Sequence, residues 1–501
     1  MADGKSAVEK TGEAIEQAGA EQKAGAKQEE GDKVSRMGTG SIPRLITEFA
    51  VPSIIGMLVN GAYNVIDSIF LGQALGEIGL STATVAQPIM TVFMALSMLV
   101  GNGGNALAAL RMGEGNRAGA ERSLGNTVTL SIVISIIVAV IAHVPACING
   151  LLSISGATDE CWSYAQTFIQ LISLGFIFQC IGMGVNNFIR TAGAPNRALL
   201  TMVIGSAACI AFNYLFVMVL GWGVRGSALA TICGQAVSCA SVLWYFLLTK
   251  GVPIKLRRRN LALQGSTVKL ILSLGLASFA IQSGAAIVSF LLNNLLNTYG
   301  AASDIGAEGA LASIGVVNRV AMFAVLPLVG TATAIQPLLG YNYGAHLYPR
   351  VRKTLWYGVA AATSIGVVLW ALVHLFPNQI VGLFGVEEEL LEFTVFALKI
   401  QLLLLPLVGF QIVGSNYFQA TGQPSKSVLL SLTRQILFLI PMYLILPQVL
   451  PSIFPSITSL DALYYAVPVA DFLAIFTTAV FIALEMRRLG RLERGELKAK
   501  F

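Results

Sequence analysis

Three polar side chains follow one another at helical spacing inside an apolar segment. The segment covers residues 52–72, PSIIGMLVNGAYNVIDSIFLG, and about 20 apolar residues are enough to cross a bilayer as a helix. Asn60, Asn64 and Asp67 are four and three residues apart, which places them on one helical face. A carboxylate at the bilayer centre costs at least about 2.5 kcal/mol and usually faces a protein interior or a water-filled cavity. Asp67 is therefore a candidate for binding a proton or a cation, with a structural contact to a neighbouring helix as the alternative.

The composition is that of a polytopic membrane protein. Of the 501 residues, 55% are hydrophobic and 12% are charged, whereas a soluble globular chain carries about 25% charged residues. The net charge of +6 does not indicate a nucleic-acid partner, because the basic residues lie in short loops of the kind that set membrane topology. His143, His346 and His374 are far apart and form no metal-binding motif, which disfavours a metal-dependent enzyme.

Twelve apolar segments follow the first 46 residues, and they predict an all-α protein with twelve transmembrane helices. The segments are 47–72, 82–110, 124–145, 160–190, 196–220, 227–249, 268–297, 311–338, 354–375, 393–420, 427–448 and 463–486.

The loops between these segments alternate in charge. One set carries most of the Lys and Arg, and the alternate set carries most of the Asp and Glu with Arg225 as its only arginine. Basic loops stay in the cytoplasm. We therefore expect a multi-pass protein of the plasma (inner) membrane with both termini in the cytoplasm.

The two halves of the sequence repeat each other. Gly193 and Pro195, in NNFIRTAGAPNRALL, recur 229 residues later as Gly422 and Pro424, in SNYFQATGQPSKSVL. The same offset places Gly115 on Gly344. Because each half holds six segments, both halves enter from the same side and the repeats are parallel, an arrangement typical of transporters with a substrate site between the repeats.

The repeat and the charge pattern divide the chain into five parts. We expect a disordered cytoplasmic tail at 1–42, an amino-terminal lobe at 43–249, a basic cytoplasmic linker at 250–267, a carboxy-terminal lobe at 268–486 and a cytoplasmic tail at 487–501.

Three long stretches of the sequence resemble the multidrug and toxic compound extrusion (MATE) family. They are AVPSIIGMLVNGAYNVIDSIFLG, VGNGGNALAALRMGEGNRAGAERSLGN and QPLLGYNYGAHLYPRVRK. The resemblance covers about 45–486, and QPLLGYNYGA is more similar to the MepA/DinF-like bacterial branch than to the NorM branch. It implies two six-helix lobes around a V-shaped central cleft, and export of drugs in exchange for protons or sodium.

The resemblance also implies roles for individual residues. Asp67 matches the acid of the family's first helix, and Pro52 matches a proline near which that helix bends in some members. Asn213 matches an asparagine of the fifth helix, and Thr231 resembles a polar residue of the sixth. Together with Asn64, which lies on the face of Asp67, these residues form the expected ion-coupling site.

The sequence departs from the family pattern in both lobes. Many members carry an aspartate four residues after the fifth-helix asparagine, where this chain has Val217. The NorM branch carries acids in helices 7 and 10, where this chain reads SFAIQSGAAIVSF and LLPLVGFQIVGSN. Ion coupling is therefore expected in the amino-terminal lobe, through Asp67 as its single carboxylate.

Further polar and adaptable side chains lie inside the apolar segments. Methionines at four-residue spacing suit promiscuous ligands, although such a stripe in a helix bundle more often reflects ordinary packing. The candidates for a substrate cleft are Asn60, Met90, Met94, Gln282, Asn318 and Gln411.

Three other features have mainly structural interpretations. Arg434, Gln435 and Asp471 are expected to form a buried polar cluster inside the second lobe. Asn187 and Asn416 are expected to cap helices or pack loops near the cytoplasmic side. Cys147 and Cys161 flank one outward loop, so that a disulfide between them is possible but not required.

These features predict a secondary active exporter that needs no cofactor and acts as a monomer in the bilayer. It would export amphiphilic, cationic drugs or metabolites in exchange for H⁺ or Na⁺ by alternating access. One alternative is a flippase for a lipid-linked precursor, which would carry a strongly cationic cleft. A second is an integral-membrane transferase, which would need a pair of acids or a DxD motif near one membrane face.

Overall fold

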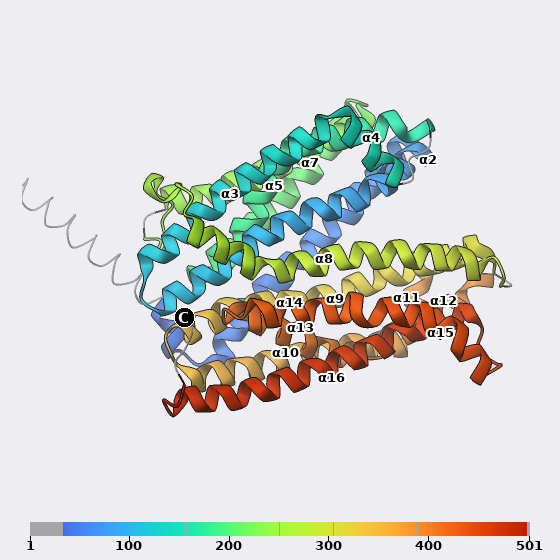
Figure 1. The fold of residues 1–501 in the computed structure, drawn as a ribbon. Helices are drawn as coiled ribbons and strands as arrows, with labels where there is room; N and C mark the ends of the chain where they lie inside the picture. Colours follow the sequence, from blue (N-terminus) through green and yellow to red (C-terminus); the bar gives the residue numbers. More distant parts are fainter. Residues whose placement is uncertain (1–33, 156–158, 250, 304, 387, 498–501) are drawn as a thin grey trace, which may run out of the picture.

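The computed structural model describes residues 34–155, 159–249, 251–303, 305–386 and 388–497, which form helices joined by turns (Figure 1). In chain order the elements are α2 (Ile42–Gly113), α3 (Arg117–His143), α4 (Pro145–Ile154), α5 (Asp159–Thr191), α6 (Pro195–Asn213), the π-helix η1 (Tyr214–Val219), α7 (Gly223–Leu248), the 3₁₀-helix η2 (Arg258–Asn260), α8 (Gly265–Gly300), α9 (Gly306–Gly344), α10 (Tyr348–Leu375), α11 (Pro377–Gly382), α12 (Glu388–Gln401), α13 (Leu405–Ala420), α14 (Pro424–Leu432), the π-helix η3 (Thr433–Leu439), α15 (Ile440–Ile453) and α16 (Ser459–Glu493).

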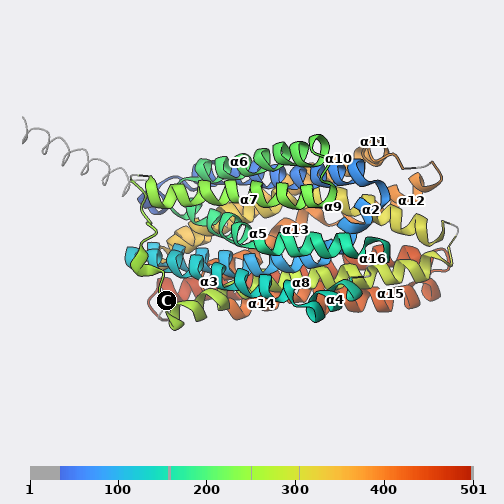
Figure 2. The ribbon, with the colours of Figure 1, turned by 90° about the horizontal axis from the view of Figure 1, so that it is seen from above.

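The long helices lie side by side along one axis in both views (Figure 1, Figure 2). Within the described residues, eleven helical stretches are long and apolar enough to cross a membrane. The pair α12 and α13, bent by 44° at their junction, provides a twelfth. The prediction of an all-α polytopic protein is confirmed, because long apolar segments can satisfy their backbone groups in lipid only as helices or closed barrels.

The first two predicted spans form one continuous helical element. Helix α2 has 72 residues and would be about 108 Å long if straight, far more than a bilayer requires. Its two ends nevertheless lie together, because both pack against Tyr341 of α9. A Cβ atom added to Gly38, just before α2, would be 3.1 Å from Cε1 of Tyr341, and a Cβ atom added to Gly113 would be 2.1 Å from the Tyr341 carbonyl oxygen. The element therefore turns back on itself (Figure 1), with Ile42–Tyr63 and Val85–Gly113 as its two apolar spans.

The helices form two groups, which approach each other closely near one end. We call α2–α7 (residues 42–248) the first half and α8–α16 (265–493) the second half (Figure 1). A Cβ on Gly103 would lie 2.0 Å from the Ile271 carbonyl oxygen, and one on Gly344 would lie 2.2 Å from that of Leu110. Glycine lets helix backbones approach this closely. The start of α2 also joins the apolar core of the second half, because Phe49 packs in the same cluster as Leu339.

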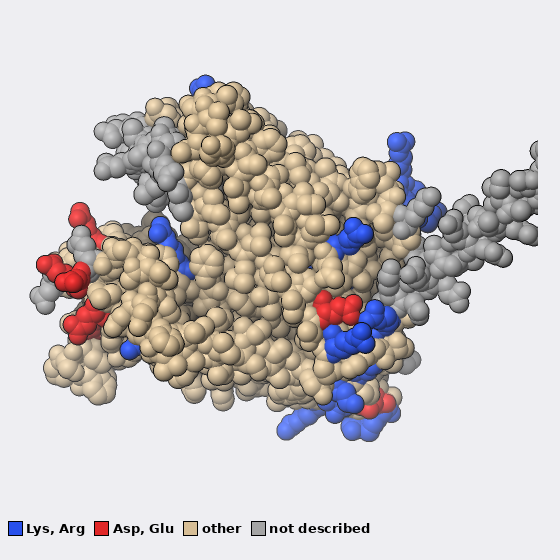
Figure 3. Space-filling model, turned by 180° about the vertical axis from the view of Figure 1, so that it is seen from behind, with Lys and Arg blue, Asp and Glu red and all other residues tan. Residues whose placement is uncertain are grey.

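Charged side chains gather at the two ends of the molecule. Figure 3 shows acidic side chains at one end, most of the basic ones at the other, and a largely uncharged surface between them. We call these the acidic end, where α9 begins, and the basic end, where α9 stops at Gly344. This separation agrees with the alternation of loop charge along the sequence; the orientation of the termini remains a prediction.

The amino-terminal boundary expected at residue 42 differs from the structure. Residues 34–39 are helical, and Met37 is buried against the second half. The Met37 carbonyl oxygen accepts hydrogen bonds from Nδ2 of Asn342 (3.0 Å) and from Nη2 of Arg350 (3.2 Å). Because these contacts form only in the tertiary structure, composition alone did not indicate them; residues 1–33 lie outside the described part of the chain.

The basic linker is bound to the first half. Val252 and Ile254 are buried in one apolar cluster with Leu124. Arg257 forms a 3.0 Å ion pair with Glu121, whose side chain is only 3% exposed. The linker therefore packs on α3 and leads directly into α8, a set of contacts that its basic composition did not indicate.

The repeated turns have matching backbone conformations. Helix α5 is followed by Gly193 (φ 80°) and α13 by Gly422 (φ 73°), a left-handed conformation that glycine adopts without strain. Proline then opens the next helix in both repeats. The expected match of Gly115 with Gly344 is wrong by two residues, because the left-handed partner of Gly115 (φ 72°) is His346 (φ 58°).

Candidate functional site

The side chains of Asp67 and Asn64 lie outside the described residues, so their contacts stay a prediction. Their backbone belongs to α2, beyond its first apolar span. Asn60, one turn before Asn64, is half-buried. Pro52 is buried within the first span, where it cannot donate the usual helical hydrogen bond, and a bend of α2 at this point remains a prediction.

Helices α6 and α7 bring the other two predicted coupling residues to one interface. Asn213 is 1% exposed, and its Nδ2 lies 4.0 Å from Sγ of Cys209. The same sulfur lies 3.6 Å from the carbonyl oxygen of Ala230, the neighbour of Thr231. Thr231 is 4% exposed, and its hydroxyl has no hydrogen-bond partner among the described residues. Two buried oxygen-bearing side chains therefore lie near each other where α6 packs on α7.

Val217 lies in the π-helix that follows Asn213. It is 3% exposed, so the position of the missing acid is an apolar core position here. A π-helix turn shifts the side chains that follow it relative to an α-helix and is frequent at functional sites. The amino-acid sequence did not indicate this irregular turn.

The predicted substrate-cleft residues do not form one described contact group. Met90 and Met94 are half-buried on the second span of α2, and Met90 packs against the apolar cluster of the first half. Gln282 is half-buried on α8, and Gln411 is 6% exposed on α13. Asn318 is exposed on α9, where its Oδ1 accepts a hydrogen bond of 3.2 Å from Nε2 of Gln401.

A line of hydrogen-bonded amides and hydroxyls joins the two halves towards the basic end. Asn105 donates to Oε1 of Gln336 (3.3 Å) and accepts from the hydroxyl of Thr191 (2.7 Å). Asn102 donates to the hydroxyl of Ser278 (3.0 Å). We call these five residues the polar seam. The seam connects α2 and α5 of the first half with α8 and α9 of the second.

Asn187 and Gln419 extend the polar seam from its two sides. Asn187 donates to Oδ1 of Asn102 (2.9 Å) and accepts from the fully buried Arg190, so its expected role in capping or loop packing is wrong. Gln419, which the repeat offset pairs with Arg190, donates to Ser278 (3.1 Å). The only sequence signal for the seam was the pair of asparagines in LVGNGGNA, and it did not indicate their partners.

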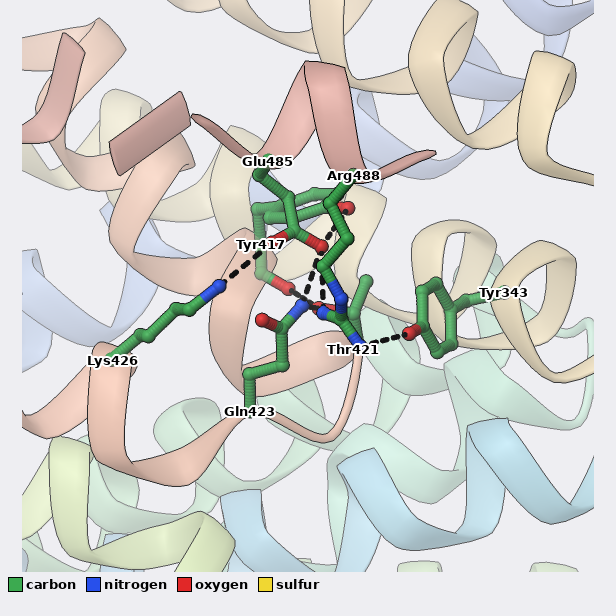
Figure 4. Close-up of polar contacts among 7 residues, drawn as sticks. All are labelled: Tyr343, Tyr417, Thr421, Gln423, Lys426, Glu485 and Arg488. Carbon is green, nitrogen blue, oxygen red and sulfur yellow. Dashed lines mark hydrogen bonds and ion pairs between the residues drawn. The ribbon is translucent and has the colours of Figure 1, made fainter. Parts of the chain in front are cut away.

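A buried carboxylate organises the basic end of the second half (Figure 4). Glu485 on α16 is 0% exposed, and it lies 2.8 Å from Nζ of Lys426 and 3.0 Å from Nη1 of Arg488. Gln423 donates to it at 2.8 Å and the hydroxyl of Tyr417 at 3.5 Å. We call these five residues the Glu485 cluster. It ties the turn between α13 and α14 to the end of α16.

A second ion pair lies deeper in the same half. Nε of Arg434 is 2.6 Å from Oδ1 of Asp471, and the acid is 6% exposed while the guanidinium side chain is 27% exposed. The predicted contact between Arg434 and Asp471 is therefore confirmed. Gln435 faces α8 instead: a Cβ atom added to Gly284 would lie 3.0 Å from the Cβ of Gln435.

Cysteine and metal chemistry receive no support from the described residues. Within this part of the chain, Cys147 is exposed, Cys161 is buried, and no disulfide joins them. Nor do the described residues include a group of three His, Cys, Asp or Glu side chains that could hold a metal ion.

The comparison with protein families identifies the chain. The model of the family described as MatE matches residues 52–215 and 285–445, one stretch in each half. This chain belongs to the MatE family. It is therefore a multi-pass membrane transporter and not an enzyme, as the sequence predicted.

Proteins similar to this MatE chain include bacterial exporters. The multidrug export protein MepA of Staphylococcus haemolyticus is 24% identical over 87% of this chain and 93% of its own length. The probable multidrug resistance protein YoeA of Bacillus subtilis is 23% identical over 78% of this chain and 82% of its own.

Solved structures agree with the fold of this MatE chain. The MATE multidrug transporter DinF-BH, in complex with the dye rhodamine 6G, is 34% identical, covers 89% of this chain and 96% of its own, and superposes with a TM-score of 0.79. An outward-facing MATE transporter of the MOP superfamily, 24% identical, covers 91% of this chain and 98% of its own with a TM-score of 0.82.

Proposed function

We propose that this chain is a secondary active exporter of amphiphilic, cationic compounds, driven by an inward gradient of H⁺ or Na⁺. The observation that carries this proposal is the set of close contacts between the halves near the basic end, in a chain of the MatE family. Closure at one end is what an alternating-access transporter needs in one of its two states. The names of MepA, YoeA and DinF-BH support drugs as the exported class.

The coupling site in this proposal is Asp67 with Asn64, Asn213 and Thr231. Asn213 and Thr231 supply buried oxygen atoms at the α6–α7 interface, and a carboxylate can bind either a proton or, with further oxygen ligands, a hard cation. A proton that crosses inward gains about 2.3 kcal/mol per 100 mV. One proton per cycle would support a substrate gradient of roughly fifty-fold from the membrane potential alone.

The arrangement of the chain in the membrane follows from this function. We propose that the two halves act as lobes around a central cleft, that the basic end faces the cytoplasm with both termini, and that the monomer is the transporting unit. Substrate and ion would compete for the first half, directly or through a bend of α2 at Pro52. The few charged residues inside the spans favour an exporter over a flippase with a cationic cleft.

Transport into inverted vesicles tests the function and identifies the coupling ion. An H⁺ gradient and an Na⁺ gradient are imposed in separate experiments. The gradient of the coupling ion should start the uptake of rhodamine 6G. Collapse of the effective gradient with a selective ionophore should stop uptake. Uptake that is indifferent to both gradients would refute secondary active export by this chain.

A further inference from the structure

A cavity of about 350 Å³ lies at the basic end of the second half, beside the Glu485 cluster. Its lining combines the end of α9, the turn between α13 and α14, and the end of α16. The lining residues that carry the argument are Tyr343, Ser425, Lys426 and Arg488. Among the described residues, none of those assigned to the coupling site or to the polar seam lines this cavity. It is therefore separate from the transport machinery proposed above.

The cavity presents a net positive charge. Lys426 and Arg488 share a single carboxylate, that of Glu485 (Figure 4). One acid and two cations leave a formal charge of +1 in the cluster. The side chains of Lys426 and Arg488 are 36% and 25% exposed, whereas that of Glu485 is 0% exposed. The cations therefore reach the space that a ligand would occupy, and the acid lies behind them, so the cavity suits an anion.

Hydrogen-bond donors without an acceptor surround the same space. The hydroxyl of Tyr343, a residue that is 2% exposed, accepts from Nη2 of Arg488 at 3.5 Å and donates to no acceptor among the described residues. No side chain caps α14, and the backbone N–H groups of Ser425 and Lys426 have no partner in the same part of the chain. Amide and hydroxyl donors next to an ammonium and a guanidinium group form the donor set that binds phosphate oxygens.

The surface below the cations is apolar. Lys426 and Leu429 are three residues apart on α14, which places them on one helical face, and Leu429 is 42% exposed. Arg488 and Leu484 are four residues apart on α16, again on one face, and Leu484 is 56% exposed. Because α14 begins and α16 ends at this cavity, each leucine lies about one helical turn deeper in its span than the cation.

We propose that this cavity binds the phosphate group of an anionic phospholipid, whose acyl chains lie along Leu429 and Leu484. Cations with exposed leucines one turn deeper match the order of headgroup and acyl chain in a lipid, whereas a soluble phosphate compound would need no apolar surface below it. The inference applies to whichever leaflet meets the basic end, and it does not depend on the exported substrate or the coupling ion.

Lipid binding to the purified full-length protein in a maltoside detergent tests the inference. Native mass spectrometry counts the phosphatidylglycerol molecules that stay bound as the lipid concentration is raised, and the wild type should bind one of them more tightly than the rest. Ser425→Asp puts a carboxylate into the cavity and should weaken this binding at least tenfold. An acid in the first turn of a helix is favourable, so the variant should fold. Lys426→Gln, which loses one charge-assisted contact, should weaken binding roughly tenfold.

A matched variant in the first half controls for general attraction to the basic end. The repeat offset of 229 residues places Arg197 of α6 on Lys426 of α14, each two residues after the proline that opens its helix. Arg197→Gln should therefore keep the affinity for phosphatidylglycerol within about twofold of the wild type. Equal weakening in Arg197→Gln and Lys426→Gln, or unchanged binding in both Ser425→Asp and Lys426→Gln, would overturn the inference.

Two further ligands separate a lipid from other sources of phosphate. Phosphatidylcholine, which has no net charge, should bind more weakly than phosphatidylglycerol, and equal binding would overturn the preference for an anionic lipid. Glycerol 3-phosphate should not displace phosphatidylglycerol; if it does so at a similar concentration, the cavity takes a soluble phosphate compound and the lipid assignment is wrong.

Thermal unfolding gives an independent readout, because a ligand that binds only the folded state stabilises it. Phosphatidylglycerol should raise the unfolding temperature of the wild type and of Arg197→Gln, and it should raise that of Ser425→Asp much less. An equal rise in all three proteins would contradict a site in this cavity. These measurements use no ion gradient, so their outcome is separate from that of the vesicle experiment on export.

Discussion

Asn105 on α2 donates a hydrogen bond of 3.3 Å to Oε1 of Gln336 on α9, although 231 residues separate them in the sequence. Both side chains are buried, 0% and 2% exposed, so the bond is closed off from water. It lies between the two halves, on the side of the basic end. In the proposed transport cycle, opening of the basic end must break this bond and expose both amides.

Removal of the amide at residue 105 should favour opening of the basic end. In Asn105→Ala, Gln336 and Thr191 each lose a partner, and an unsatisfied buried polar group costs about 1–3 kcal/mol. The ratio of open to closed molecules should rise about tenfold. Electron-resonance distances between spin labels at two exposed positions measure this ratio: Arg258→Cys in the linker that packs on the first half, and Arg491→Cys in the second half.

A matched control removes a hydrogen bond within one half. Ser427 donates to the carbonyl oxygen of Ser415 at 3.2 Å, and both residues belong to the second half. Ser427→Ala should leave the label distances unchanged. If Asn105→Ala also leaves them unchanged, the polar seam does not hold the basic end closed.

Substitution of the buried acid in the Glu485 cluster should lower stability markedly. Glu485→Gln leaves Lys426 and Arg488 without their carboxylate, and a hydrogen bond to a charged group contributes about 1.5–3 kcal/mol. Thermal unfolding in detergent should show a fall of several degrees. Glu493→Gln is the control, because its ion pair with Arg352 is about 40% exposed on both sides and contributes less than about 1 kcal/mol. Equal shifts in the two variants would contradict the role of burial.

Asp67→Asn should separate coupling from folding. The variant keeps the size of the side chain but cannot exchange a proton, so the protein should fold normally and lose ion-driven efflux of rhodamine 6G. Asp471→Asn is the comparison: it breaks the 2.6 Å pair with Arg434 and should lower thermal stability while coupling persists. Efflux by Asp67→Asn at the wild-type rate under a proton gradient would remove Asp67 from the coupling site.

A second acid placed at residue 217 should change the pH dependence of transport. With Val217 buried and Asp67 as the expected single carboxylate, efflux in the wild type should follow one titration step. In Val217→Asp, two acids share the first half and should titrate as a coupled pair in two steps, with a stronger response to sodium because hard cations prefer several oxygen ligands. Efflux rates across pH, with and without sodium, test both statements. Two steps in the wild type would place a coupling acid elsewhere.

The orientation of the chain is testable by cysteine labelling in intact cells. Arg258 is exposed in the basic linker, and Glu389 is exposed near the start of α12 at the acidic end. In a variant without native cysteines, an impermeant reagent should label Glu389→Cys and not Arg258→Cys. The reverse pattern would invert the topology and the direction of transport proposed here.

The spans, the loop charges and the repeated turns were predictable from the sequence alone. Long apolar segments must be helical in lipid, and their ends follow from local chemistry, as the Gly193–Pro195 and Gly422–Pro424 turns show. The buried pair of Arg434 and Asp471 was also predictable, because two charges inside apolar spans have few alternatives to pairing. The family resemblance came from these same local stretches.

The meeting of distant side chains is visible only in the folded molecule. The partner of Asn105 and the four groups around Glu485 depend on how helices pack, and an asparagine or a glutamate near a helix end has many equally plausible partners in the sequence. Glu485 is close enough to Arg487 and Arg488 to suggest an exposed charged tail, yet it is fully buried. The physical reason is that helix formation is local, whereas burial of a polar group depends on surfaces brought together from residues hundreds of positions apart.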